Sequence, residues 1–216
     1  MRIAEPTVER LVLYARLLKR LQEEGVDVIS SQEIGDELGL KASQVRKDLS
    51  YFGEIGKRGV GYSVPRLCEH LQAILSPPRV WRIAMVGVGR LGGALLGYGP
   101  LHNEKFKMVA LFDVDPAKVG RTFRGAPCFH VDRIADVAAE LAIEVLILTV
   151  PAEAAQSVVD RIASSNFVKG ILNFAPAPIV VPKEILVYNV DISVELEKLL
   201  FYLKQRESQS ANFVLK

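Results

Sequence analysis

The sequence is poor in the residues that build metal sites and disulfides. It has two cysteines, Cys68 and Cys128, and three histidines in 216 residues. The cysteines lie far apart, and no C-x-x-C motif or histidine cluster accompanies them, so the common zinc frameworks are excluded. We expect both cysteines to be reduced core residues, and we expect no bound metal.

Long apolar runs are also lacking. No uninterrupted apolar stretch approaches the roughly 18 residues of a membrane span, and no basic-then-apolar signal opens the chain. We therefore expect a cytoplasmic protein without a membrane partner. Half of the residues are apolar and 24% are charged, a balance typical of a globular chain that buries a core.

A strong excess of one charge is missing, since the formal net charge is only +2, but the charges are unevenly distributed. Six lysines or arginines and two acidic residues lie between Lys41 and Arg66, whereas the preceding stretch from Glu23 to Glu37 is acidic. A basic segment of this kind is typical of a surface that meets phosphate. From charge alone, a solvated helix face is an equally good reading.

The first 78 residues have the pattern of a winged helix-turn-helix. Apolar residues recur at helical spacing from Pro6 to Gln22, and Ser30 with Glu33 forms a capping box for a helix ending near Gly39. A third helix is predicted from Ala42 to Phe52. The alternation of Val60, Tyr62 and Val64 after several glycines predicts a short β-hairpin. The run 75–78, which ends in two prolines, predicts a stiff linker.

The second half has an α/β pattern. Strands at Arg82–Val86 and Met108–Phe112 flank a helix that runs through Leu96, and further strands are predicted at Glu144–Val150 and Gly170–Phe174. We expect a Rossmann domain with a doubly wound parallel sheet over residues 79–190. Residues 191–216 are expected to form a separate C-terminal helix, so apolar that it requires burial against a large surface.

A glycine loop follows the first strand of this sheet. In Gly87-Val88-Gly89-Arg90-Leu91-Gly92, the first glycine permits a tight turn, the second lets a pyrophosphate approach the backbone, and the third lets helix and strand pack closely. The next strand ends at Asp113, where a carboxylate accepts hydrogen bonds from ribose hydroxyls and repels a 2′-phosphate. The pattern favours NAD(H) over NADP(H), although Arg90 is able either to contact the pyrophosphate or to accept a 2′-phosphate.

The remaining cofactor residues are expected at the carboxyl ends of later strands, where Rossmann ligands bind. No histidine or lysine stands there as a proton donor for hydride chemistry, so we expect a binding protein and no enzyme. The same strand ends also suit ordinary turns. The candidate cofactor-binding residues are Gly87, Val88, Gly89, Arg90, Leu91, Gly92, Tyr98, Asp113, Val114, Val150, Pro151, Asn173, Phe174, Ala175 and Asp191.

The third helix is the candidate DNA-reading element. Val45, Leu49 and Phe52 share one helical face, which leaves Gln44, Lys47 and Tyr51 on another. Glutamine reads an adenine edge, and arginine or lysine contacts guanine or phosphate. Each residue alone also suits an ordinary polar surface. The candidate DNA-binding residues are Lys41, Ser43, Gln44, Arg46, Lys47, Tyr51, Lys57, Arg58 and Gly59, of which the last three form the hairpin tip.

These motifs resemble the Rex family of redox-sensing transcriptional repressors. The resemblance rests on QVRKDLSYFG (44–53), GVGY (59–62), the glycine loop, FDVDP (112–116) and GILNFAP (170–176), and it covers nearly the whole chain. It implies a homodimer with swapped C-terminal helices and a pseudo-palindromic operator. It further implies repression when NAD+ dominates and release of the operator when NADH rises.

One position departs from the family pattern, because Lys41 stands where serine or threonine commonly caps the recognition helix. Three explanations remain open. The replacement costs about 1 kcal/mol of helix stability, Ser43 caps the helix one turn later, or Lys41 contacts a phosphate in place of capping the helix.

Three further residues are candidates for a switch: Arg16 on the first helix, Tyr98 near the end of the helix after the glycine loop, and Asp191 before the terminal helix. Oxidised nicotinamide is positively charged and the reduced ring is not, so a nearby carboxylate can distinguish them. The alternatives are a solvated Arg16, a packed Tyr98 and an Asp191 that only caps the terminal helix.

Two other functions remain open at this point. One is a small NAD-dependent oxidoreductase whose N-terminal module is only a dimerisation arm. The other is a Rossmann protein that binds coenzyme A, since this fold hosts several ligands.

Overall fold

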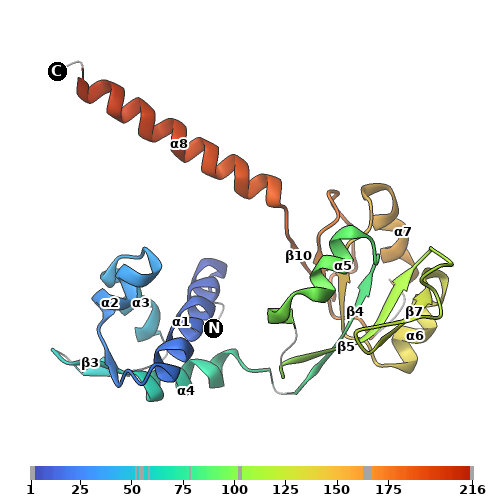
Figure 1. Cartoon of the computed structure of the whole chain (residues 1–216), viewed down its shortest axis with the longest axis horizontal. Coiled ribbons are helices and arrows are strands. Elements are labelled where there is room, and N and C mark those ends of the chain that lie inside the picture. The colour runs from blue at the N-terminus through green and yellow to red at the C-terminus, as the bar shows by residue number, and fades with distance from the viewer. Residues whose placement is uncertain are drawn as a thin grey trace. The chain divides into compact units, whose positions relative to one another are not determined.

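The computed structural model describes residues 3–51, 53, 56–57, 59–77, 79–101, 104–162 and 167–214 (Figure 1). The chain divides into two compact units, Met1–Pro78 and Arg79–Lys216. The first unit has one apolar core and the second has two, one on each face of its sheet. Three residues of predicted features lie outside the described residues: Phe52 at the end of the third helix, Arg58 in the middle of the hairpin tip and Pro78 at the end of the linker.

The first unit is a winged helix-turn-helix, as predicted. Its antiparallel sheet has the strand order β1-β3-β2, and β2 and β3 form the wing. The elements are α1 (Glu5–Glu23), β1 (Val28–Ile29), α2 (Ser31–Leu38), α3 (Ala42–Ser50), β2 (Gly56–Lys57), β3 (Gly61–Ser63) and α4 (Val64–Leu75).

The start and end of α2 follow directly from its sequence. The Ser30 hydroxyl accepts a hydrogen bond from the Glu33 amide at 3.1 Å, and the Glu33 carboxylate accepts one from the Ser30 amide at 2.7 Å. Gly39 ends the helix with φ of 68°. Gly35 packs on the turn to α3, because a Cβ there would lie 2.5 Å from the Leu40 carbonyl oxygen. The predicted capping box is confirmed.

The end of the wing differs from the prediction. Val64 was expected in the hairpin, but it is the first residue of α4 and is completely buried. Pro65 suits the first turn of a helix because its missing N–H needs no partner there. Val60 lies in the turn and is 61% exposed, so of the three alternating residues only Tyr62 lies in a strand, β3.

The second unit is a doubly wound α/β domain, as predicted. Its sheet has the order β10-β9-β8-β4-β5-β7-β6, and all pairs are parallel except β6 with β7. Ala84 and Val86 of β4 pack with α6 and α7, whereas Ile83 and Met85 pack with α5 on the opposite face. The elements are β4 (Trp81–Val86), α5 (Arg90–Gly97), β5 (Phe106–Asp113), β6 (Thr122–Phe123), β7 (Ala126–His130), α6 (Ile134–Glu140), β8 (Val145–Leu148), α7 (Ala152–Ile162), β9 (Gly170–Asn173) and β10 (Leu186–Asn189).

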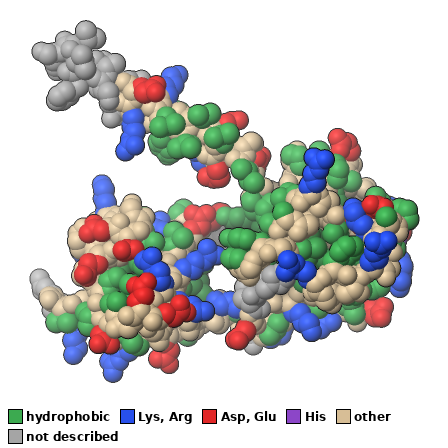
Figure 2. Space-filling view, in the orientation of Figure 1, with side chains coloured by type: hydrophobic (Ala, Val, Ile, Leu, Met, Phe, Trp, Pro, Cys, Tyr) green, Lys and Arg blue, Asp and Glu red, His purple; other side chains and the backbone are tan. Residues whose placement is uncertain are grey.

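The last helix is α8 (Ile192–Val214), and the side chains of its residues 192–207 are all exposed within the chain. Leu196, Leu199, Leu200 and Phe201 are each 54–56% exposed, and Figure 2 shows apolar side chains gathered along this helix. Among the helices of the described residues, none combines the length and the apolar character that crossing a bilayer requires.

Both cysteines are buried and free, as expected for core residues. Burial raises the pKa of the Cys68 and Cys128 thiols, which keeps them protonated and unreactive.

Candidate nucleotide site and nucleic-acid interface

The glycine loop lies where the strand order of the sheet reverses, between β4 and β8. Gly87 has φ of 93°, and a Cβ at Gly92 would lie 2.0 Å from the Gly87 carbonyl oxygen. Gly89 is the N-cap of α5, and a Cβ there would meet no atom within 4 Å. The loop is thus tightly packed at its first and last glycines and open at the middle one, a cradle that fits a pyrophosphate at a helix N-terminus.

Thr149, which the sequence analysis did not single out, holds this loop from the neighbouring strand. Its hydroxyl lies 2.6 Å from the Gly87 carbonyl oxygen and 3.0 Å from that of Val86. It follows β8 directly, so its place at a strand end was the available signal. The hydroxyl ties the two strands together at the point where the loop begins.

Asp113 ends β5 and connects to the same loop. Its carboxylate accepts hydrogen bonds from the Val88 amide at 2.7 Å, the Asp115 amide at 2.9 Å and the Lys118 ammonium at 3.1 Å. Burial alone would raise the pKa of Asp113, but these hydrogen bonds outweigh it and hold the pKa below its usual value. The group stays ionised, as an acceptor for ribose hydroxyls must be. Lys118 is a second residue that the sequence analysis missed.

Asn173 shapes the strand ends beside the loop. It is 1% exposed, and its amide donates to the Ala177 carbonyl and to Asn189 Oδ1 and accepts from the Ala175 amide. Its polar atoms therefore already have protein partners. Phe174, which follows Asn173, is half-buried, and Ala175 is buried. After β8, Val150 is half-buried and Pro151 is exposed.

The other candidate cofactor residues are on the surface. Arg90 and Leu91 begin α5, Tyr98 is the C-cap of the same helix and is 54% exposed, and Val114 follows β5. These positions are accessible to a ligand.

Asp191 caps α8. Its Oδ1 accepts hydrogen bonds from the Ser193 hydroxyl and the Ser193 amide, which lower the pKa of the Asp191 carboxyl. Asp191 therefore caps the terminal helix, which was one of the two roles considered for it. Arg16, the third switch candidate, is an exposed residue of α1 in the other unit.

Helix α3 presents most of the candidate DNA-binding residues to solvent. Lys41 is its N-cap, and its side chain makes no capping hydrogen bond. A cap by Ser43 one turn later stays a prediction. Lys47 and Tyr51 are exposed, as the helical pattern predicted, while Val45 and Leu49 are buried. The surface left by this packing is free to meet a nucleic acid.

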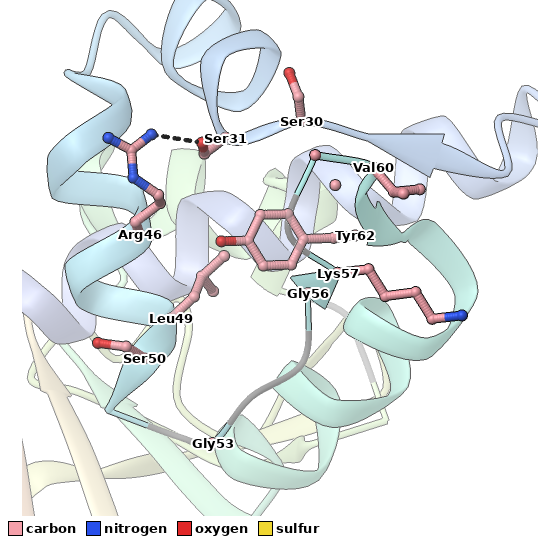
Figure 3. A pocket seen from close by; sticks show the side chains of 12 residues that line it. Ser30, Ser31, Arg46, Leu49, Ser50, Gly53, Gly56, Lys57, Val60 and Tyr62 are labelled. Atoms are coloured by element: carbon pink, nitrogen blue, oxygen red, sulfur yellow. Dashed lines mark hydrogen bonds between the residues drawn. The ribbon is translucent and has the colours of Figure 1, made fainter.

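A hollow separates α3 from the wing. Figure 3 shows the Tyr62 ring in its middle, with Arg46 on one side and Lys57 on the other, and Arg46 donates a hydrogen bond to the Ser31 hydroxyl at 3.0 Å. Its lining residues are Ser30, Ser31, Arg46, Leu49, Ser50, Gly53, Gly56, Lys57, Gly59, Val60, Gly61 and Tyr62. Hydroxyl and cationic groups around an aromatic floor suit a sugar-phosphate backbone.

Proteins of known function resemble the chain along nearly its whole length. A Listeria welshimeri protein named redox-sensing transcriptional repressor Rex is 43% identical over 203 residues, which are 94% of each chain. A Thermus thermophilus protein of the same name is 47% identical over 201 residues, 93% of this chain and 94% of its own. The chain belongs to the Rex family of redox-sensing transcriptional repressors.

Solved structures agree with membership of the Rex family. A Rex-family repressor called RSP, solved with β-NAD+ and operator DNA, matches with a TM-score of 0.87 and 31% identity, covering 98% of this chain and 97% of its own. RSP with β-NADH matches with a TM-score of 0.86 and 30% identity, covering 98% and 99%. The resemblance drawn from the sequence is confirmed, and the Rex assignment favours the repressor over the oxidoreductase.

Family models match each half of this Rex chain separately. The model of a DNA-binding protein N-terminus matches residues 2–50, and that of the CoA binding domain matches residues 79–177. Within the part of the chain that the structure describes, no group of three or more histidine, cysteine or acidic residues is placed to hold a metal.

Proposed function

We propose that this Rex protein binds a pseudo-palindromic operator in the cytoplasm as a homodimer, and releases it when NADH occupies the glycine loop. The main support is that one chain contains both sites. One unit has the open loop at Gly89 and an ionised Asp113, and the other has the basic, solvent-facing helix α3. The solved states of RSP, with β-NAD+ and operator DNA and with β-NADH, support the same cycle.

The residues present fit a dinucleotide. The amides at the N-terminus of α5 would hold the pyrophosphate and Asp113 the adenosine ribose, with Val150, Phe174 and Ala175 near the nicotinamide. Cofactor and DNA are coupled if NADH favours a conformation whose recognition helices do not match successive major grooves. The coupling then requires only that the DNA-binding and the released conformation differ in their affinity for NADH.

A selection experiment tests this function. The full chain would be used to enrich duplexes from a randomised pool, with and without NADH. We expect a two-fold symmetric sequence to emerge only without NADH. NADH, and not coenzyme A, should raise the melting temperature, and NADH mixed with carbonyl compounds should remain unoxidised. A coenzyme A effect or steady turnover would contradict the proposal.

Arg46, Lys47 and Arg58 are proposed to carry DNA binding. Lys47→Ala should weaken binding to all sequences and reduce the salt slope by about one, because a phosphate contact is lost. Arg46→Ala and Arg58→Ala should cost roughly 1–3 kcal/mol on the operator only, if these side chains read bases. Lys183→Ala, an exposed lysine in the other unit, is the matched control. Unchanged affinity in all three variants would remove this surface from the account.

Asp113 is proposed to select NADH over NADPH. Asp113→Ala should weaken NADH binding by about 1.5–3 kcal/mol, because a hydrogen bond to a charged group is lost, and should narrow the preference over NADPH. Lys118→Met should widen that preference, since the ammonium beside Asp113 offsets part of the negative charge. Calorimetry with NADH and NADPH measures the ratio of the two affinities in each variant. Wild-type protein that responds equally to NADH and NADPH would overturn the assignment.

Arg16, Tyr98 and Asp191 are proposed as the switch. Asp191→Ala should narrow the difference between NADH and NAD+ in releasing operator by about fivefold or more, within the usual range of coupling energies. Asp191→Asn separates charge from capping, because its side-chain oxygen can still accept from the Ser193 amide. Both variants should narrow the difference between NADH and NAD+ to a similar extent. An Asp191→Asn protein with the wild-type ratio would leave this residue as a helix cap.

A further inference from the structure

A buried carboxylate joins the recognition helix to α1. Asp48 of α3 is 1% exposed and accepts four hydrogen bonds. Two come from Arg10, Nε at 2.5 Å and Nη2 at 2.8 Å, and one comes from the Tyr14 hydroxyl at 2.8 Å. The fourth comes from Nε2 of Gln44, also at 2.8 Å. Asp48 thus lies between a fixed support on α1 and a side chain that is a candidate for base recognition.

The charge of Asp48 determines the orientation of Gln44. Burial alone would raise the pKa of Asp48, but the hydrogen bonds from Arg10, Tyr14 and Gln44 outweigh it and keep the carboxyl ionised. An ionised carboxylate only accepts hydrogen bonds. The end of the Gln44 amide that faces Asp48 must therefore be Nε2, because a flipped amide would place its carbonyl oxygen against a negative charge.

Gln44 occupies the right place on α3 for reading DNA. It lies in the first turn of this helix, one helical turn before Asp48, so the two side chains share a face. Residues near the N-terminus of a recognition helix are those that contact base edges in the major groove. Gln44 is half-buried, so part of its amide remains accessible.

We propose that Asp48 is a positioning residue that makes Gln44 select adenine over guanine. The inference rests on the proposed function, in which α3 enters the major groove. With one Nε2 proton held by Asp48, Gln44 has one N–H and one carbonyl oxygen left for a base. Adenine offers the matching pair, an acceptor at N7 and a donor at N6, whereas guanine offers two acceptors, N7 and O6.

The test uses the duplex that the wild-type full chain selects from a randomised pool. Each A·T pair in it is replaced by G·C, and affinity is measured for wild type, Asp48→Asn, Gln44→Ala and the double variant. Wild type should lose about tenfold at one A·T pair in each half-site. The loss should fall below about threefold in Asp48→Asn, because a neutral amide at residue 48 permits Gln44 to flip. The double variant should behave like Gln44→Ala, and the salt slope should not change.

Tyr14→Phe is the matched control, because it removes another hydrogen bond from the same carboxylate without touching Gln44. It should lower the melting temperature and keep the adenine preference. An Asp48→Asn protein that binds every duplex more weakly but keeps the wild-type preference would overturn the inference and leave the proposed function standing. Failure to enrich any sequence would instead contradict the proposed function, and the inference with it.

A measurement on the wild-type protein covers the case in which Asp48→Asn does not fold. The selected adenine is replaced by 7-deazaadenine, which lacks the N7 acceptor, or by purine, which lacks the N6 donor. Both replacements should weaken binding, because Gln44 presents one donor and one acceptor. A loss with 7-deazaadenine alone would show that Gln44 presents no acceptor and would overturn the inference.

Discussion

Gly92→Ala is expected to abolish the response to NADH while leaving operator binding intact. The added Cβ would lie 2.0 Å from the Gly87 carbonyl oxygen and 3.0 Å from the Thr149 hydroxyl, so helix and strand must separate at the glycine loop. Overpacking of this kind costs roughly 1–3 kcal/mol, and here the displaced atoms are those that cradle the pyrophosphate. Calorimetric NADH titration and NADH-driven release of operator measure the effect.

Gly93→Ala is the control at the next position. A Cβ there would meet no atom within 4 Å, and alanine is favoured over glycine in a helix. Its melting temperature should be equal to or above that of wild type, and its NADH response should be unchanged. If Gly92→Ala and Gly93→Ala respond to NADH alike, close packing at Gly92 is not what forms the site.

Deletion of residues 191–216 is expected to destroy the dimer and, with it, operator binding. Helix α8 exposes Leu196, Leu199, Leu200 and Phe201 within one chain. We propose that a second copy of the chain covers them by exchange of the terminal helices. A monomer meets one half-site only, and losing the second costs at least about a hundredfold in affinity. Sedimentation and operator binding at matched protein concentrations measure both effects.

A point substitution tests the apolar surface of α8 without removing the end of the chain. Leu200→Glu should weaken dimerisation because it places a charge among the apolar residues of α8, whereas Glu197→Gln on the same helix should have no effect. A truncated protein that remains dimeric and binds operator would refute the role of α8.

Much of the architecture was predictable because it depends on local chemistry. The capping box of Ser30 and Glu33 predicted the start of α2, and Gly39 predicted its end. In the structure the helix begins and ends at these residues. The glycine loop was predictable because its glycines are required by the backbone conformation and packing of the loop itself. Asp113 was predictable from its place at the end of the next strand.

The features that escaped prediction depend on contacts between distant segments, or were hidden by a misleading local pattern. Helix α4 was missed because its first residue, Val64, continued an apparent alternation. Asp48 counted only as one charge in a basic segment, since its partner Arg10 lies 38 residues away. Thr149 was missed because its hydroxyl bonds to the loop after another strand, 62 residues away in the chain. Asn173 was predicted as a cofactor residue, but its hydrogen bond to Asn189 on the neighbouring strand was not foreseen.

Titration of the operator complex with NADH and with NAD+ shows whether the redox state of the nucleotide controls DNA binding. The selected duplex, labelled and bound to the full-length protein, is followed by fluorescence anisotropy as each nucleotide is added. We expect NADH to release the duplex at a concentration at least about tenfold below that at which NAD+ has any effect, because only differential affinity shifts the equilibrium. Equal midpoints for the two nucleotides, or a complex that neither nucleotide dissociates, would contradict it.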